Sequence, residues 1–67
     1  MEVDVDKLKR LREENVLSQR DLARMAQLTH TTVWRIEHGH QARPGTIRKV
    51  AGVLGVEPKE LLLRRGE

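Results

Sequence analysis

Apolar residues recur every three or four positions through most of the chain, and this period is typical of amphipathic helices. Between residues 17 and 39 the pattern predicts two short helices joined by a tight turn. The first spans residues 18–26 and the second spans residues 29–38. Gly39 then ends the second helix, because glycine readily adopts the positive φ that terminates helices.

Each of these helices begins at a residue that can cap it. The hydroxyl groups of Ser18 and Thr29 can accept a hydrogen bond from a backbone N–H of the first turn, and Asp21 lies in the first turn after Ser18. An apolar residue precedes each cap and has an apolar partner five positions later, which is the spacing of a hydrophobic staple. The two pairs are Leu17 with Leu22 and Leu28 with Val33.

The inward faces of the two helices indicate that the helices cross. Leu22, Ala23 and Ala26 lie on one side of the first, and Val33 and Ile36 lie on one side of the second. The two alanines leave room for a neighbouring helix. Two helices that cross steeply over a short turn form a helix-turn-helix, a motif whose second helix enters the major groove of DNA.

A further helix is predicted before this pair. Asp6 can cap a helix that ends near residue 14, with Leu8 and Leu11 facing inward. Residues 1–5 are expected to fray, as chain termini commonly do.

Two more helices are predicted after Gly39. Thr46 can cap a helix over residues 47–54, and Gly55 fits its left-handed C-terminal cap. Pro58 suits the first position of a last helix over residues 58–63, in which Leu61 faces the core. The chain shows no strand pattern, so the predicted fold class is all-α with five helices.

The length of 67 residues predicts one small domain over residues 1–67, with its core between about residues 6 and 63. Cysteine is absent, which excludes disulfides and thiolate zinc sites. The N-terminus lacks the apolar run of a signal peptide and no stretch reaches the length of a membrane span, so we expect a cytoplasmic protein.

The sequence contains no set of residues typical of a catalytic or metal site. The three histidines, at positions 30, 38 and 40, lack the spacing of a compact metal site. Neither a nucleophile–base pair nor a glycine-rich phosphate loop is present. We therefore expect no metal, no cofactor and no enzymatic activity.

The positive charge is concentrated in the middle of the chain. The net charge is +3, and residues 18–49 carry six basic and two acidic side chains, whereas the flanking segments are nearly balanced. Such a basic stretch is typical of a phosphate-binding face. The alternative is an ordinary solvated helix surface, since 34% of the residues are charged.

A longer set of residues stands at fixed spacings along the chain. These positions are Gln19-x-x-Leu22-Ala23-x-x-Ala26, Val33-x-x-Ile36-Glu37-x-Gly39, Pro44, and Ile47-Arg48-Lys49-Val50-Ala51-x-x-Leu54-Gly55-Val56. The pattern resembles the phage repressor/Cro-like helix-turn-helix family, of the xenobiotic-response-element type. The resemblance covers about residues 6–63 and implies a compact, five-helix, lambda-repressor-like DNA-binding domain. The chain departs from the family at Gln27, where a glycine is usual; at positive φ, glutamine would cost on the order of 1 kcal/mol relative to glycine.

The resemblance also implies which residues contact DNA. Arg35 can donate two parallel hydrogen bonds to guanine, Thr31 can offer its hydroxyl or methyl group, and His30 can donate to a purine acceptor. Thr32 matches the family motif less firmly and is assigned to a contact with a base or a phosphate. The alternative for these four residues is that they form an exposed polar surface without function. The complete predicted DNA-binding set is Gln19, His30, Thr31, Thr32, Arg35, His38 and Arg43.

Within that set, Gln19 is expected to contact the DNA backbone and to steady the first base-reading residue, and His38 and Arg43 are expected to contact phosphate. The family further implies a partly buried ion pair between Arg12 and Glu37; the alternative is a solvated Arg12. Trp34 is assigned to packing first, with a sugar–phosphate contact or a partner surface as the alternatives.

These features predict a transcriptional regulator, most simply a repressor that binds a palindromic operator as a homodimer. The predicted dimer interface comprises Pro58, Lys59, Leu62 and Leu63. One alternative is the antitoxin of a toxin–antitoxin pair, which would bind both a toxin and DNA. Another is the controller of a restriction–modification system.

Overall fold

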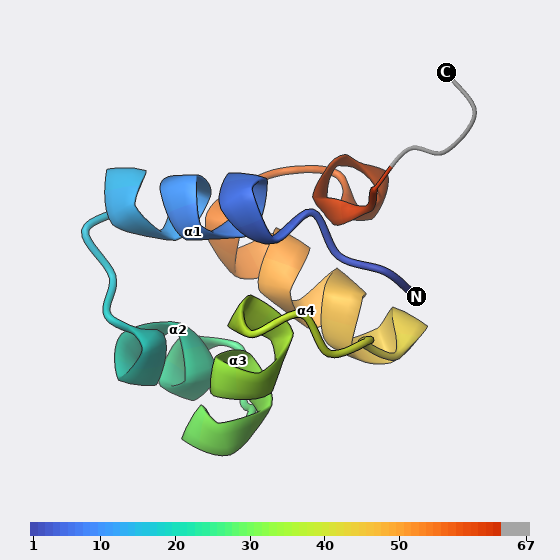
Figure 1. The fold of residues 1–67 in the computed structure, drawn as a ribbon. Coiled ribbons are helices and arrows are strands. Elements are labelled where there is room, and N and C mark those ends of the chain that lie inside the picture. Colours follow the sequence, from blue (N-terminus) through green and yellow to red (C-terminus); the bar gives the residue numbers. More distant parts are fainter. Residues whose placement is uncertain (64–67) are drawn as a thin grey trace.

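The computed structural model describes residues 1–63, which form four α-helices and one 3-10 turn (Figure 1). The all-α fold class is confirmed, although the last predicted helix is a 3-10 turn. No helix in this part of the chain is both long and apolar enough to span a bilayer. The elements are α1 (Val5–Glu14), α2 (Gln19–Met25), α3 (His30–Glu37), α4 (Pro44–Leu54) and η1 (Pro58–Leu61).

Helices α2 and α3 begin at the two predicted caps. The Ser18 hydroxyl accepts from the Asp21 backbone N–H at 3.0 Å, and the Asp21 carboxylate accepts from the Ser18 N–H at 3.1 Å. These hydrogen bonds, the backbone one first, lower the pKa of the Asp21 carboxyl group below its usual range. Thr29 caps α3 by accepting from the Thr32 N–H at 3.2 Å. The start of each helix is therefore fixed by a local hydrogen bond.

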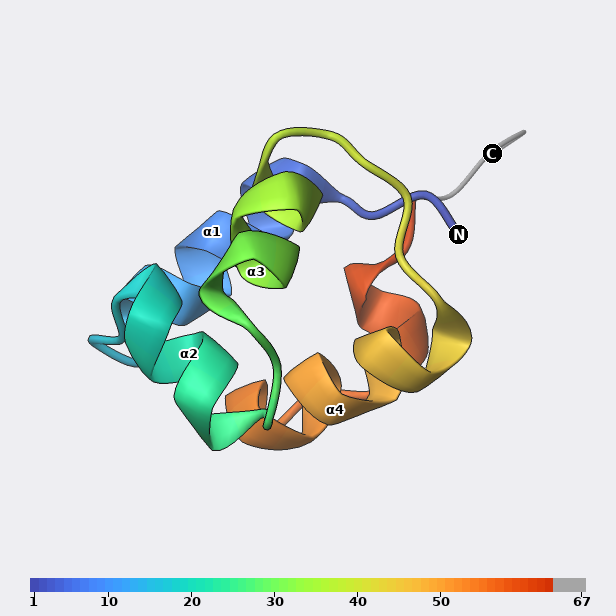
Figure 2. The same cartoon turned by 90° about the horizontal axis from the view of Figure 1, so that it is seen from below.

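The core lies where the helices meet around one apolar centre (Figure 2). Leu8 of α1, Leu22 of α2, Val33 of α3, Val50 of α4 and Leu61 of η1 are all essentially inaccessible to solvent. Each element thus supplies at least one fully buried side chain, and none is peripheral to the core.

The N-terminal segment is ordered, and the expectation that residues 1–5 fray is wrong. Val3 forms an antiparallel bridge with Leu62 and is only 5% exposed. Met1 and Ala42 exchange two backbone hydrogen bonds, of 2.8 and 3.0 Å. With these residues held in place, Asp4 rather than Asp6 caps α1, by accepting from the Lys7 N–H.

Two boundaries in the C-terminal half also differ from the prediction. Helix α4 begins at Pro44 rather than after Thr46, because proline has no N–H to satisfy and its φ is already helical. The last element ends at Leu61 instead of residue 63. Leu62 adopts an extended conformation in order to pair with Val3, and this pairing stops the helix.

Four residues adopt positive φ among the described residues. Gly39 and Gly55, at +90° and +72°, end α3 and α4 as predicted. Gln27 has φ of +59°, so the turn of the helix-turn-helix keeps the conformation that favours glycine. Val16, at +55°, was not foreseen, and it is a β-branched residue that is 87% exposed.

We predict that Val16→Gly stabilises the protein. Relief of the left-handed conformation contributes roughly 1–2 kcal/mol, and the greater chain entropy of glycine offsets about 0.5–1 kcal/mol of it. The expected result is a gain of about 0.5–1 kcal/mol in the free energy of unfolding, measured by urea denaturation. Val16→Thr is the control, since it remains β-branched and should give no gain. A lower urea midpoint for Val16→Gly would contradict the prediction.

Candidate nucleic-acid interface

A buried ion pair connects α1 with the end of α3. The Nε and Nη2 atoms of Arg12 donate to the two carboxylate oxygens of Glu37, at 2.6 and 3.0 Å. The Glu37 side chain is fully buried and that of Arg12 is 14% exposed. Arg12 also donates from Nη1 to the Leu17 carbonyl at 2.8 Å, which ties the entry to α2 into the same group.

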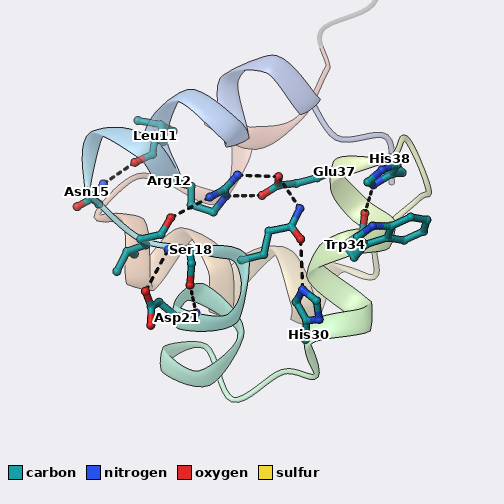
Figure 3. A network of polar contacts seen from close by, with 11 residues as sticks. Leu11, Arg12, Asn15, Ser18, Asp21, His30, Trp34, Glu37 and His38 are labelled. Carbon is teal, nitrogen blue, oxygen red and sulfur yellow. Dashed lines mark hydrogen bonds and ion pairs between the residues drawn. The ribbon is translucent and has the colours of Figure 1, made fainter.

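Gln19 extends this ion pair to the first residue of α3 (Figure 3). Its Nε2 donates to Glu37 Oε1 at 3.0 Å, and its Oε1 lies 3.3 Å from His30 Nε2. Gln19 therefore holds the ring of His30 from the neighbouring helix, which is the steadying role that the family resemblance implies. Its contact with the DNA backbone stays a prediction.

The front of α3 is polar and open to solvent. His30, Thr31 and Arg35 are exposed, whereas Thr32 is half-buried. The Thr32 hydroxyl lies 2.9 Å from the Thr29 hydroxyl, so part of its hydrogen-bonding capacity is used within the protein. The structure thus presents the three predicted base-reading residues outward and turns Thr32 toward the cap residue Thr29.

A polar cleft of about 400 Å³ lies beside α3. Its lining includes Arg35 from α3 and Arg43 from the following loop, two of the predicted site residues. His40 and Gln41, for which the sequence predicted no role, also line it. Gly39 indicated that the chain turns after α3, but no pattern in the sequence indicated that the loop after it lies beside the exposed face of α3. The complete lining is Thr32, Arg35, Ile36, His40, Gln41, Ala42, Arg43 and Thr46.

Around the cleft, the acidic side chains have charged partners, whereas two of the basic side chains have none within the described part of the chain. Between residues 18 and 49 the two acidic residues are Asp21, which caps α2 and pairs with Arg24, and Glu37, which is buried against Arg12. Neither Arg35 nor Arg43 has an ion pair or side-chain hydrogen bond within residues 1–63. The cleft is therefore flanked by positive charge that no nearby carboxylate neutralises.

Trp34 lies on the surface rather than in the core. Its ring stacks on that of His38, with centroids 3.8 Å apart and planes 19° apart, and it is 44% exposed. His38 Nδ1 lies 2.7 Å from the Trp34 carbonyl oxygen, which fixes the histidine ring at the end of α3. Trp34 thus packs on its own helix, and its exposed side remains available to another molecule.

The segment predicted to form a dimer interface comprises η1 and the two residues after it, and η1, drawn in red, lies away from α2 in both views of the fold (Figures 1 and 2). Lys59 and Leu63 are exposed, and Pro58 and Leu62 are half-buried. Leu63 and Met1, each 49% exposed, line a shallow apolar cleft together with Glu2 and Leu62.

We predict that Arg12→Met destabilises the fold by about 3–5 kcal/mol, because it leaves the Glu37 carboxylate buried without its charged partner. Adding Glu37→Leu to this variant should recover most of the loss, since the second change removes the unpaired charge. Urea denaturation of both single variants and the double variant measures this coupling. Additive losses in the double variant would contradict it.

Comparison with known proteins places the chain in a family. The helix-turn-helix family model matches residues 8–61. Among solved structures, the N-terminal DNA-binding domain of SinR from Bacillus subtilis superimposes with a TM-score of 0.83 and 26% identity, over 94% of each chain. A search of curated proteins found no match. The chain therefore belongs to the helix-turn-helix family, of the phage repressor and Cro-like type, whose members are DNA-binding transcription regulators rather than enzymes.

Proposed function

We propose that this protein represses transcription by binding a specific double-stranded DNA sequence with α3 in the major groove. The observation that supports this most directly is the pair of unpartnered cations, Arg35 and Arg43, beside a polar helix front without a free carboxylate. Similarity to the DNA-binding domain of SinR points the same way. Occupying the groove would exclude other proteins from the same base pairs, which is the simplest route to repression.

The proposed contacts divide into two kinds. Arg35 donates two parallel hydrogen bonds to O6 and N7 of a guanine, and Thr31 contacts a neighbouring base through its hydroxyl or methyl group. Arg43, His38 and Gln19 contact phosphates, which position the protein without distinguishing sequences. Thr32, whose hydroxyl already contacts Thr29, is assigned to phosphate.

We further propose that two copies bind a palindromic operator, with half-sites about 34 Å apart along the duplex. Met1 and Leu63 expose apolar surface around a cleft of about 360 Å³, next to Leu62. Burial of this surface against a second copy would remove apolar area from water, which favours association. Pro58 and Lys59 of η1 would border that contact.

Replacing each arginine separately tests whether Arg35 contacts a base and Arg43 contacts a phosphate. We predict that Arg35→Ala costs about 1–3 kcal/mol in binding and relaxes the preference at one base position. Arg43→Ala should weaken all sequences alike and lower the salt slope of the binding constant by about one unit. Binding is measured by fluorescence anisotropy with duplexes first selected from random DNA. If both variants change preference and salt slope identically, the assignment of the two arginines is wrong.

The oligomeric state tests the dimer. We predict that the wild-type protein sediments as a dimer on its operator and that Leu63→Gln shifts it toward the monomer, because a polar side chain opposes burial of this surface. Met25→Gln is the matched control, since Met25 is similarly exposed, at 53%, but belongs to α2.

A wild-type protein that occupies each operator half as an independent monomer would contradict the dimer. Stable co-purification of a second polypeptide, lost in Leu63→Gln, would instead favour the antitoxin alternative, in which the same apolar surface binds a toxin.

A further inference from the structure

The contacts among Arg12, Glu37, Gln19 and His30 have a defined hydrogen-bond direction. A guanidinium group only donates and an ionised carboxylate only accepts. Glu37 Oε1, which also accepts from Arg12 Nη2, can therefore contact only the donor end of the Gln19 amide, and Nε2 is the atom that lies 3.0 Å from it. The amide oxygen of Gln19 must then face the other way, toward His30 (Figure 3).

This orientation determines which nitrogen of His30 carries a hydrogen. The amide oxygen of Gln19 can only accept, so His30 Nε2, 3.3 Å away, must donate. A neutral imidazole has one donor and one acceptor nitrogen. Its Nδ1 is therefore an unprotonated acceptor, and no other group among the described residues bonds to it, while the residue as a whole is exposed.

We infer that His30 reads its base pair as a hydrogen-bond acceptor and contacts the exocyclic amino group that the pair presents in the major groove. Adenine N6 and cytosine N4 are such donors, whereas guanine and thymine present oxygen or nitrogen acceptors at the corresponding edge. The inference rests on the proposed function, in which α3 enters the major groove. It reverses the expectation from sequence alone, that His30 donates to a purine acceptor.

Gln19 is a positioning residue in this scheme. It fixes the His30 ring through its oxygen and is itself fixed by Glu37, a carboxylate that Arg12 holds in place. One hydrogen of its amide remains unused after the bond to Glu37, so a contact with phosphate is compatible with the same orientation. The base preference at His30 thus depends on a residue that touches no base.

The experiment begins with selection of binding sites from random duplex DNA in buffer above the ordinary pKa of histidine. The base pair under His30 is the one whose preference disappears in His30→Ala. Because every pair joins a base with an amino group to a base without one at this edge, the test removes the amino group alone: replacing the adenine of that pair by purine, or its cytosine by 2-pyrimidinone, should weaken wild-type binding about tenfold, in line with one good base contact, and leave His30→Ala unchanged. Equal wild-type binding with and without the amino group, or no position that loses preference in His30→Ala, overturns the inference.

Two amide variants separate positioning from general affinity. Gln19→Ala should abolish the preference at the His30 base pair, whereas Asn15→Ala, which removes an exposed amide at the end of α1, should preserve it. Long-range proton–nitrogen correlation spectra of the histidine rings provide a readout independent of DNA. They should show His30 protonated at Nε2 in the wild type and a shift toward the mixture of free imidazole in Gln19→Ala.

Protonation of neutral His30 at Nδ1, or an unchanged preference in Gln19→Ala, overturns the inference. The proposed function fails separately, if the wild-type protein selects no sequence at all. If a sequence is selected and Arg35→Ala relaxes it at one position, the proposed function stands whatever the base under His30 is.

Discussion

The arrangement of the first three helices depends on one buried negative charge. A carboxylate removed from water is costly unless charged and polar partners compensate it. Glu37 lies at the end of α3, and its partners come from α1 and α2, through Arg12 and Gln19. The carboxylate can be satisfied only when these three helices are correctly placed. Displacing α1 or α2 would leave the buried carboxylate without one of these partners.

The same buried charge shapes the electrostatics of the outer face. Of the two carboxylates between residues 18 and 49, Glu37 is withdrawn into the interior and Asp21 is used in a helix cap. Arg35 and Arg43 consequently form no ion pair with a carboxylate of residues 1–63. A net charge of only +3 thus understates the local field, because the negative charges are placed where they cannot oppose an approaching phosphate.

Structural features that depend only on residues adjacent in the chain were predictable from the sequence. The caps at Ser18 and Thr29 are local hydrogen bonds, and the glycine stops at Gly39 and Gly55 follow from backbone freedom. Features that depend on contacts between segments far apart in the chain were not predictable. Nothing near Val3 in the chain indicates that its partner is Leu62, and that pairing both ordered the N-terminus and shortened the last helix.

Some residues of the candidate site could likewise be predicted from the sequence, and others required the three-dimensional structure. The exposed face of α3, including His30 and Arg35, follows from helical periodicity, and the Arg12–Glu37 pair follows from the family resemblance. The contribution of His40 and Gln41 to the cleft required the path of the loop in space. The direction of the hydrogen bonds through Gln19 required the positions of its two amide atoms.

The positive-φ turns show why the chain tolerates residues other than glycine at strained positions. Val16 and Gln27 adopt positive φ, and each is followed by a leucine, Leu17 or Leu28, that packs against the core. A left-handed conformation costs roughly 1–2 kcal/mol in a residue other than glycine. Full burial of a leucine side chain gains about 1.5–3 kcal/mol. Leu17 and Leu28 are partly buried, so each contact offsets part of the strain in the residue before it. The residue after each turn thus helps to hold the two turns that bracket α2, while the strained residue keeps a cost that a glycine would remove.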